Sequence, residues 1–228
     1  MHLKIANDLN KKMNMSKNDE ALFKFGSVMP DNEGYVVQGL SNIGIYDISH
    51  FARHQKLDYA VYNLPDQKKF LDEYKSKINN PLVLGCFAHI LADYFFNYNT
   101  FNYKYYAKNG KIIGVKVINN SIIYTDKDTI RIYKQEDFEK YSRAIYSEIN
   151  ADVDIRMIDN IYRECKNIKE INYTKNDVKK TIEYMNNMKY MYANKQYNQI
   201  QYHIYSEKDL EGMVQECEKY IEEKIVNV

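Results

Sequence analysis

The chain contains 228 residues, of which 45% are hydrophobic and 28% are charged, so it is long enough to bury one sizeable core in one main domain. The 32 basic residues almost balance the 31 acidic residues, and the net charge of +1 excludes a global attraction to nucleic acid or to an anionic membrane. Any recognition of phosphate must therefore be local.

Targeting signals and cysteine patterns are absent from the sequence. No stretch reaches the length of apolar sequence that a transmembrane helix needs, and the N-terminal residues lack the apolar core of a signal peptide. We therefore expect a cytoplasmic protein without a transmembrane segment. The three cysteines are widely spaced and form no Cys-x-x-Cys pair, which predicts buried small side chains rather than disulfides or a thiolate zinc site.

The first hundred residues favour helices. Only 3 prolines and 8 glycines interrupt the whole chain, which argues against a β-fold with many turns. The spacing of apolar residues and the positions of Pro65 and Pro81 predict four helices, over residues 2–14, 18–26, 66–78 and 81–98. Glycine and proline predict a loop over 26–34. The expected fold is mainly α, a multi-helix bundle.

Residues 110–134 differ from the rest of the chain. They are rich in β-branched residues that partly alternate with polar ones, and turn residues interrupt them, so we predict a small β-hairpin or three-stranded insert with its last strand at 129–133. Helical spacing then returns and predicts a C-terminal helical extension over 136–228. Its helices are expected over residues 136–149, 151–168, 175–195 and 206–226.

His89 and Asp93 lie four residues apart inside the apolar run from Pro81 to Phe96. At helical pitch this spacing places an imidazole and a carboxylate on one face of a buried helix. Burial of both groups costs free energy unless something binds them, and a metal ion such as zinc takes both as ligands. The alternative is a core histidine that is hydrogen-bonded to its own helix neighbour. The pair alone leaves both interpretations open.

Two histidines and one aspartate upstream are further candidates for metal binding. His50 has apolar neighbours on both sides, which favours an inward direction. His54 follows four residues later on what is expected to be the same helix, but polar and charged neighbours indicate a solvated face. Asp31 follows Pro30, where its carboxylate either turns into a central site or caps the next segment.

The remaining two histidines carry weaker signals. His2 begins the first predicted helix, with apolar residues behind it, and the alternative to a ligand is a terminal histidine that frays. His203 lies in a tyrosine-rich segment and has no predicted role.

Four short motifs follow one another along the first 95 residues: His2-Leu-x-Ile-Ala6, Gly26-Ser-x-x-Pro-Asp31, Ser49-His-Phe51 and Gly85-x-x-x-His-x-x-x-Asp93. In this order they resemble the zinc-dependent phospholipase C family, whose wider superfamily includes zinc-dependent single-strand nucleases. The resemblance covers less than half of the chain. It implies an all-α bundle with a zinc cluster among its helices.

The resemblance also implies a ligand set. His50, His89 and Asp93 would hold one zinc ion, and Asp93 would bridge to a second ion that His2 binds alongside the N-terminal groups of the chain. Asp31 would be a further ligand, or the base that orients the attacking water. Secreted members of the family carry another histidine where this chain has Asn99, followed by a later His-x-x-x-Glu pair that this chain lacks. This departure implies at most two metal ions.

The expected function is the metal-dependent hydrolysis of a small-molecule or lipid phosphate ester, in which zinc activates water. The alternative is a metal-stabilised helical protein or interaction module without turnover, because four of the candidate ligands are enough to close a structural site. A helical phosphohydrolase of the adjacent His-Asp type is excluded, since the chain has no His-Asp dipeptide. No cluster of basic and aromatic residues predicts a nuclease, and the sequence leaves the substrate and the oligomeric state open.

Overall fold

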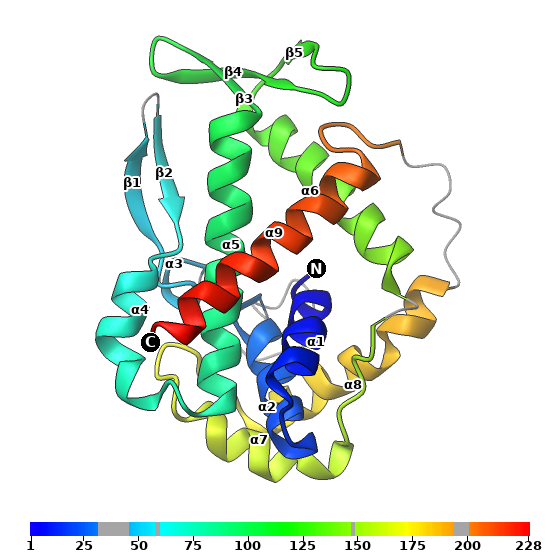
Figure 1. Ribbon diagram of the computed structural model, residues 1–228. Helices are drawn as coiled ribbons and strands as arrows, with labels where there is room; N and C mark the ends of the chain where they lie inside the picture. The colour runs from blue at the N-terminus through cyan, green and yellow to red at the C-terminus, as the bar shows by residue number, and fades with distance from the viewer. Residues whose placement is uncertain (32–45, 58–59, 147–148, 194–200) are drawn as a thin grey trace.

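The computed structural model describes residues 1–31, 46–57, 60–146, 149–193 and 201–228 (Figure 1). As predicted, the fold is mainly α. Its α-helices in the described ranges are α1 (His2–Met13), α2 (Lys17–Val28), α3 (Tyr46–Ser49), α4 (Gln67–Tyr74), α5 (Pro81–Tyr103), α6 (Lys127–Ala144), α7 (Ile158–Cys165), α8 (Lys175–Ala193) and α9 (Glu207–Val226). Two small antiparallel sheets accompany them: β1 (Arg53–Leu57) with β2 (Ala60–Leu64), and β3 (Tyr105–Lys108) with β4 (Lys111–Lys116) and β5 (Ile122–Tyr124).

Helix α5 runs through the middle of the molecule and α9 crosses it (Figure 1). The Asn80 side chain begins α5 by accepting hydrogen bonds from the backbone N–H groups of Leu82 and Val83 at 3.0 and 3.3 Å, and Pro81 occupies the first turn. The first three turns of α5 are buried on all sides, because their residues are almost all apolar. The helix continues to Tyr103, beyond the end that the sequence predicts.

Helices α2 and α5 approach closely at two glycines. A Cβ atom on Gly26 would lie 2.1 Å from the backbone oxygen of Leu82, and a Cβ atom on Gly85 would lie 2.2 Å from the backbone oxygen of Phe23. No side chain fits either position, so the crossing depends on glycine at both. The close approach places the last turn of α2, including Ser27, beside the middle of α5.

One hydrophobic core includes residues from both halves of the chain. The cluster of buried side chains extends from Leu3 in α1 to Ile221 in α9 and includes Ile161 of α7 and Val178 of α8. Helix α9 packs against α1 and α5, and α7 packs against α2 and α5. The C-terminal helices that the sequence predicts as an extension therefore share a core with the N-terminal helices.

The predicted strand at 129–133 is wrong. Helix α6 begins at Lys127, because Asp126 caps it by accepting hydrogen bonds from the N–H groups of Asp128 and Thr129, both at 2.9 Å. The β-branched residues of this segment belong to the first turns of α6, where Ile130 is fully buried. The insert itself is the three-stranded sheet β3–β4–β5, which spans 105–124 rather than 110–134.

The helix expected to carry both His50 and His54 is also absent. Helix α3 ends at Ser49, and Phe51 has a φ of 54°, in the left-handed region that ends a helix. His54 lies on β1, opposite Asn63 of β2. The predicted loop over 26–34 begins later than expected, since α2 continues to Val28 and a 3₁₀ turn follows at Met29–Asp31. Residues 32–34 lie outside the described ranges.

Candidate metal centre

Five side chains from four separate segments converge at the middle of α5. His89 and Asp93 come from α5 itself, Asp31 from the 3₁₀ turn after α2, His50 from the residue after α3, and His2 from the start of α1. One ligand atom from each of the first four lies within 4.8 Å of the others. The Nε2 atom of His2 lies 3.3 Å from Asp93 Oδ1 and 3.6 Å from Asp31 Oδ2. A buried cluster of this composition can hold a metal ion.

The imidazoles of the cluster face the carboxylates through their Nε2 atoms. His50 Nε2 lies 3.3 Å from Asp31 Oδ1, 3.4 Å from Asp93 Oδ2 and 3.1 Å from His89 Nε2. His89 Nε2 lies 3.6 Å from Asp31 Oδ1. Both histidines are almost completely buried, so these contacts are shielded from bulk water.

The backbone of α2 fixes the orientation of His89. Its Nδ1 atom lies 2.8 Å from the carbonyl oxygen of Ser27, and because a carbonyl only accepts hydrogen bonds, Nδ1 carries the proton. The lone pair of neutral His89 is then on Nε2 and points into the cluster. This contact exists because the glycine crossing brings α2 so close to α5. Hydrogen bonds of this kind orient histidines that bind metals.

The alternative interpretation of His89 as a core histidine bonded to its own helix neighbour does not hold. His89 Nε2 and Asp93 Oδ2 are 4.0 Å apart, which is too long for a hydrogen bond. The four-residue spacing places the two groups on the same face of α5, as expected. They are connected through His50, which contacts both His89 and Asp93.

Burial and mutual contact set the protonation of the cluster. Burial, reinforced by the neighbouring His2, lowers the pKa of His89 to about 4, although Asp31 and Asp93 oppose this shift. Burial raises the pKa of Asp93, but its hydrogen bond with His2 and the nearby His89 outweigh burial and hold the pKa at about 2. Burial also raises the pKa of Asp31, but the nearby His89 and the hydrogen bond with His50 outweigh burial and keep this pKa below its ordinary value. At neutral pH His89 is neutral and both carboxylates are ionised, which are the forms that bind metal.

The residues fit a divalent cation. The carboxylates of Asp31 and Asp93 make close contacts with imidazoles, and within the described ranges neither forms an ion pair with lysine or arginine. The Nδ1 atom of His2 is buried and has no hydrogen-bond partner among the described residues. Two partly buried negative charges close to one neutral, buried imidazole are unfavourable, and a bound cation would neutralise them.

A cavity of about 940 Å³ opens onto the cluster. His2, Asp31 and Asp93 lie in its wall, together with residues of α6 and α8. Lys134 of α6 also lines it and donates a hydrogen bond to Asn97 Oδ1 at 2.6 Å. Burial lowers the pKa of Lys134 to about 8, although Asp93 opposes the shift. Nothing in the sequence around Lys134 indicates this role, and the strand predicted at 129–133 is where the first turns of α6 lie.

Tyr46 and the N-terminus also border the cluster. The Tyr46 ring stacks on His50 with 4.0 Å between ring centroids, and its hydroxyl lies 3.4 Å from Asp93 Oδ2. The amino group of Met1 lines the cavity and donates a hydrogen bond to Ser142 Oγ at 3.2 Å.

His54 and His203 lie outside the cluster. His54 is exposed on β1. The Nε2 atom of His203 lies 3.0 Å from Glu136 Oε2, and its ring stacks on Tyr133 with 4.4 Å between centroids. These contacts give His203 a structural setting that is separate from the candidate metal centre.

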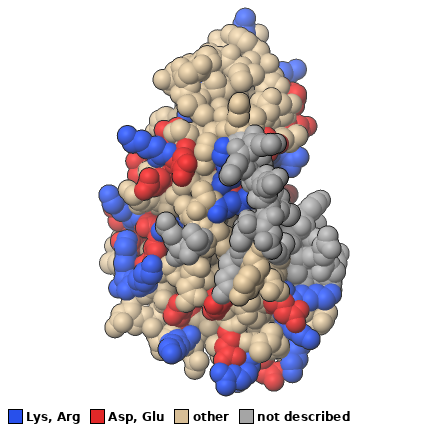
Figure 2. Space-filling model, turned by 90° about the vertical axis from the view of Figure 1, so that its right-hand side faces the viewer, with Lys and Arg blue, Asp and Glu red and all other residues tan. Residues whose placement is uncertain are grey.

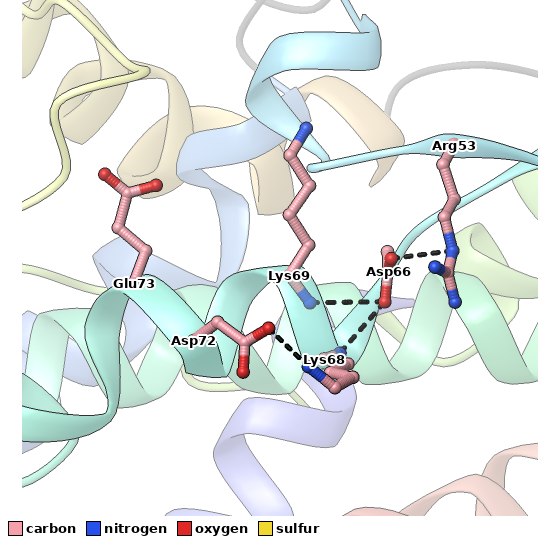
Figure 3. A pocket seen from close by; sticks show the side chains of 6 residues that line it. All are labelled: Arg53, Asp66, Lys68, Lys69, Asp72 and Glu73. Atoms are coloured by element: carbon pink, nitrogen blue, oxygen red, sulfur yellow. Dashed lines mark hydrogen bonds and ion pairs between the residues drawn. The ribbon is translucent and has the colours of Figure 1, made fainter.

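A second hollow, of about 650 Å³, lies at the start of α4 (Figure 3). The carboxylate of Asp66 is its central group, and Asp66 Oδ1 accepts hydrogen bonds from the backbone N–H groups of Lys68 and Lys69 at 3.0 and 3.2 Å. Arg53 Nε lies 2.7 Å from Asp66 Oδ2, and Lys68 pairs with Asp72. Helix capping and ion pairing already engage these charges, so this hollow is not a candidate site.

The fold and the cluster together define a mainly α protein with a candidate metal centre beside a cavity. Comparison of the chain with protein-family models, with curated proteins and with solved structures gave no match. Among the helices in the described part of the chain, none has the length and apolar character that crossing a membrane requires.

Proposed function

We propose that this protein is a metal-dependent hydrolase of phosphate esters, with zinc held by His2, Asp31, His50, His89 and Asp93. The observation that carries the proposal is the pair of partly buried carboxylates beside an open cavity, which contact buried imidazoles but form no ion pair with a lysine or arginine of the described chain. A catalytic metal site keeps a position open for water or substrate, whereas a structural site is usually closed by its ligands.

In both carboxylates the two oxygens face different histidines, which supports up to two metal ions. Asp93 directs Oδ1 toward His2 and Oδ2 toward His50. Asp31 directs Oδ2 toward His2 and Oδ1 toward His50 and His89. His50 and His89 would therefore hold one ion and His2 the other, with a carboxylate between them, as the resemblance to the zinc-dependent phospholipase C family implies.

The donor set favours zinc, because imidazole nitrogens with carboxylate oxygens suit this metal and no thiolate contributes. When bound, zinc lowers the pKa of water toward neutrality and neutralises charge on phosphoryl oxygens. The lowered pKa of Asp31 makes this carboxylate a weak base. Asp31 would therefore bind the metal, or orient water by accepting a hydrogen bond, rather than act as a base that takes a proton from water.

Lys134 would bind the anionic phosphate ester. Its ammonium group is held by neutral Asn97, and in the described chain it forms no ion pair. It lines the same cavity as Asp31 and Asp93. The charge of Asp93 is close enough to raise the pKa of Lys134 against the effect of burial. A fixed cation in this position would attract the phosphate and stabilise negative charge that develops on it.

A metal-stabilised protein without turnover is the second candidate. Asp31, His50, His89 and Asp93 alone complete a four-ligand set within 4.8 Å, which is enough for a structural site. In that case His2 would be dispensable for metal binding, whereas the hydrolase needs it for the second ion. The His2→Ala variant therefore separates the two candidates.

The test loads the metal-stripped, untagged protein with zinc and measures zinc content and hydrolysis of bis(p-nitrophenyl) phosphate and phosphatidylcholine. Asp93→Asn is expected to lose zinc and to reduce turnover by roughly 100-fold or more. His203→Asn, which removes a histidine outside the cluster, is the matched control and should keep both. Zinc-loaded, folded protein that hydrolyses none of these esters would favour the structural site instead.

A further inference from the structure

One segment of this nearly neutral chain is strongly basic. Between Asp93 and Asp126 there is no acidic residue, whereas the segment contains four lysines, at positions 104, 108, 111 and 116. It forms the end of α5 and the whole sheet β3–β4–β5. The local excess of positive charge therefore lies on one structural unit.

The same unit carries exposed hydrophobic side chains. Of the ten large hydrophobic residues that are exposed in the described ranges, five belong to this segment: Tyr103 (69% exposed), Tyr106 (36%), Ile118 (43%), Ile123 (40%) and Tyr124 (68%). We call these five residues, with Lys108, Lys111 and Lys116, the sheet patch. Exposed apolar side chains that gather in one place mark a surface that binds something.

The register of the sheet brings two of these tyrosines together. Gly114 of β4 lies opposite both Tyr106 of β3 and Tyr124 of β5, and the two rings meet edge to face with 5.9 Å between centroids. A Cβ atom on Gly114 would lie 2.6 Å from the backbone oxygen of Ile123, so glycine is required there. Because side chains alternate along a strand, Lys116 shares this outer face. Val115 and its partner Ile123 lie on the other face, where Val115 is buried and Ile123, on the last strand of the sheet, stays 40% exposed.

The sheet patch lies at one end of the molecule. In Figure 1 the sheet extends past the end of α5 and beyond the helices. Figure 2 shows this end as a largely uncharged cap with basic side chains at its tip and edge, and with acidic side chains at the edge directly below the basic ones. The end of the molecule is thus free to approach a flat surface.

We propose that the sheet patch binds the anionic surface of a lipid membrane. Tyrosine side chains settle at the boundary between lipid headgroups and water, and isoleucine side chains enter the acyl region beneath it. Lysine side chains extend their charge to the headgroups, where each is attracted to anionic lipids. The three kinds of side chain in the patch match these three layers. The proposal does not depend on the proposed hydrolase.

The pairing of two lysines supports an anionic partner. Lys108 and Lys111 lie directly opposite each other across the turn of β3 and β4, and like charges in this arrangement are destabilising. Anionic headgroups would remove this repulsion, whereas a second copy of the same face would add to it. Single-stranded nucleic acid would need a row of aromatic side chains along a basic groove. Tyr106 and Tyr124 instead meet each other edge to face, and Ile118 and Ile123 provide no stacking.

The test is co-sedimentation of the full chain with vesicles of phosphatidylcholine alone or with added phosphatidylserine. Wild type should bind the vesicles that contain phosphatidylserine, and high salt should weaken binding. Lys108→Gln/Lys111→Gln should lower the partition coefficient about 25-fold, at about fivefold for each lysine. Lys17→Gln/Lys169→Gln removes the same charge from exposed positions outside the patch and should leave binding unchanged.

A second variant pair tests the hydrophobic contribution. Tyr106→Ser/Tyr124→Ser should weaken binding, whereas Ile155→Ser/Val226→Ser, which removes exposed apolar side chains elsewhere, should not. All four variants should hydrolyse soluble bis(p-nitrophenyl) phosphate at the wild-type rate, so the result is independent of the proposed activity.

Three results would overturn the proposal. The first is equal sedimentation of wild type and Lys108→Gln/Lys111→Gln with anionic vesicles, including no binding by either. The second is binding to a single-stranded oligonucleotide without binding to vesicles, and the third is a dimer in light scattering that Tyr106→Ser/Tyr124→Ser abolishes.

Discussion

At the scale of single residues, Lys134 stands out because its ammonium group lines the cavity, is partly buried and is bonded to a neutral amide. A partly buried cation without a carboxylate partner is less well solvated than one in bulk water, and an anionic ligand would compensate for this loss. The cavity between Lys134 and the carboxylates of Asp31 and Asp93 is a suitable place for an anion. Because Lys134 is not a proposed metal ligand, the effect of its charge on activity can be measured separately from metal binding.

Lys134→Met should reduce kcat/KM for phosphate esters by roughly 10- to 100-fold, because a cation aimed at the phosphate is lost. The zinc content should stay unchanged, since Lys134 is not among the proposed ligands. Steady-state kinetics and elemental analysis of the variant check both expectations. Lys208→Met, an exposed lysine on α9, is the control. Unchanged kinetics of Lys134→Met would remove this lysine from the proposed site.

The five converging residues of the site could be selected from the sequence because each lies in a short motif. The spacing of His89 and Asp93 and the position of Asp31 after Pro30 are local signals, and the order of the four motifs over the first 95 residues supplied the full set through the resemblance. Their role as ligands stays a prediction. Lys134 could not be selected, because its place opposite Asp93 depends on how α6 packs on α5 and not on its neighbours in the sequence.

At the scale of elements, the crossing of α2 and α5 positions the site, because it allows Ser27 to hold His89. Gly85→Ala should lower the free energy of unfolding by about 3 kcal/mol, since the added Cβ atom would overlap a backbone oxygen at 2.2 Å. Gly212→Ala on α9 is the matched control. Its Cβ atom would meet nothing within 4 Å, and alanine should raise stability by about 0.5–1 kcal/mol.

Urea unfolding of the two glycine variants measures both effects. The Gly85 variant should also bind zinc less tightly, because the Ser27 carbonyl would move away from His89. Equal stability of Gly85→Ala and wild type would show that the helices do not approach as closely as described.

The packing of α9 on α1 predicts a dependence of stability on pH. Burial, with a smaller contribution from Asp8, raises the pKa of Glu218 to about 7, from an ordinary value of 4.5. The folded protein therefore holds this proton more tightly than the unfolded chain, and the contribution to stability declines as pH rises from about 4.5 to 7. Above pH 7 the ionised, buried carboxylate remains destabilising.

Glu218→Gln should remove this decline and increase the free energy of unfolding at pH 8 by about 1–3 kcal/mol relative to wild type. Urea unfolding at pH 5 and pH 8 gives the comparison, and Glu216→Gln, at an exposed position of the same helix, should change little. If the free energy of unfolding changed by the same amount between pH 5 and pH 8 in wild type and in Glu218→Gln, Glu218 would not be the source of the pH dependence.

The sequence predicts helices better than strands in this protein. The helices with clear caps or apolar stripes, such as α5 and α9, lie close to their predicted ranges. The β-branched residues of segment 129–133 are typical of strands and led to the wrong prediction. The segment is helical because Asp126 caps α6 and Ile130 is buried in the core. The strand β1 has no alternating pattern of its own and exists through pairing with β2, which local sequence does not reveal.

At the scale of the whole molecule, the cluster joins segments that are distant in the sequence. It connects the start of α1, the turn after α2, the end of α3 and the middle of α5, and these pack on one core that extends to α9. A metal ion bound here would hold all four segments together. Binding to the folded state alone also stabilises that state by mass action.

Zinc should therefore raise the midpoint of thermal unfolding. At a free zinc concentration about 1,000 times the Kd, the stabilisation is about 4 kcal/mol. Differential scanning calorimetry with and without EDTA measures the shift. The Asp93→Asn variant should show no such shift, and an equal shift in that variant would place the zinc elsewhere.

The most direct test of the metal centre is elemental analysis of the purified, untagged protein and of its Asp93→Ala variant. The proposed site predicts about one or two zinc ions per chain in the wild type and their loss in the variant, because both sets of histidines face Asp93. Wild-type protein that is folded but free of metal after zinc has been offered would contradict it. The cluster would then be a buried hydrogen-bonded network, and the proposed hydrolase would fail with it.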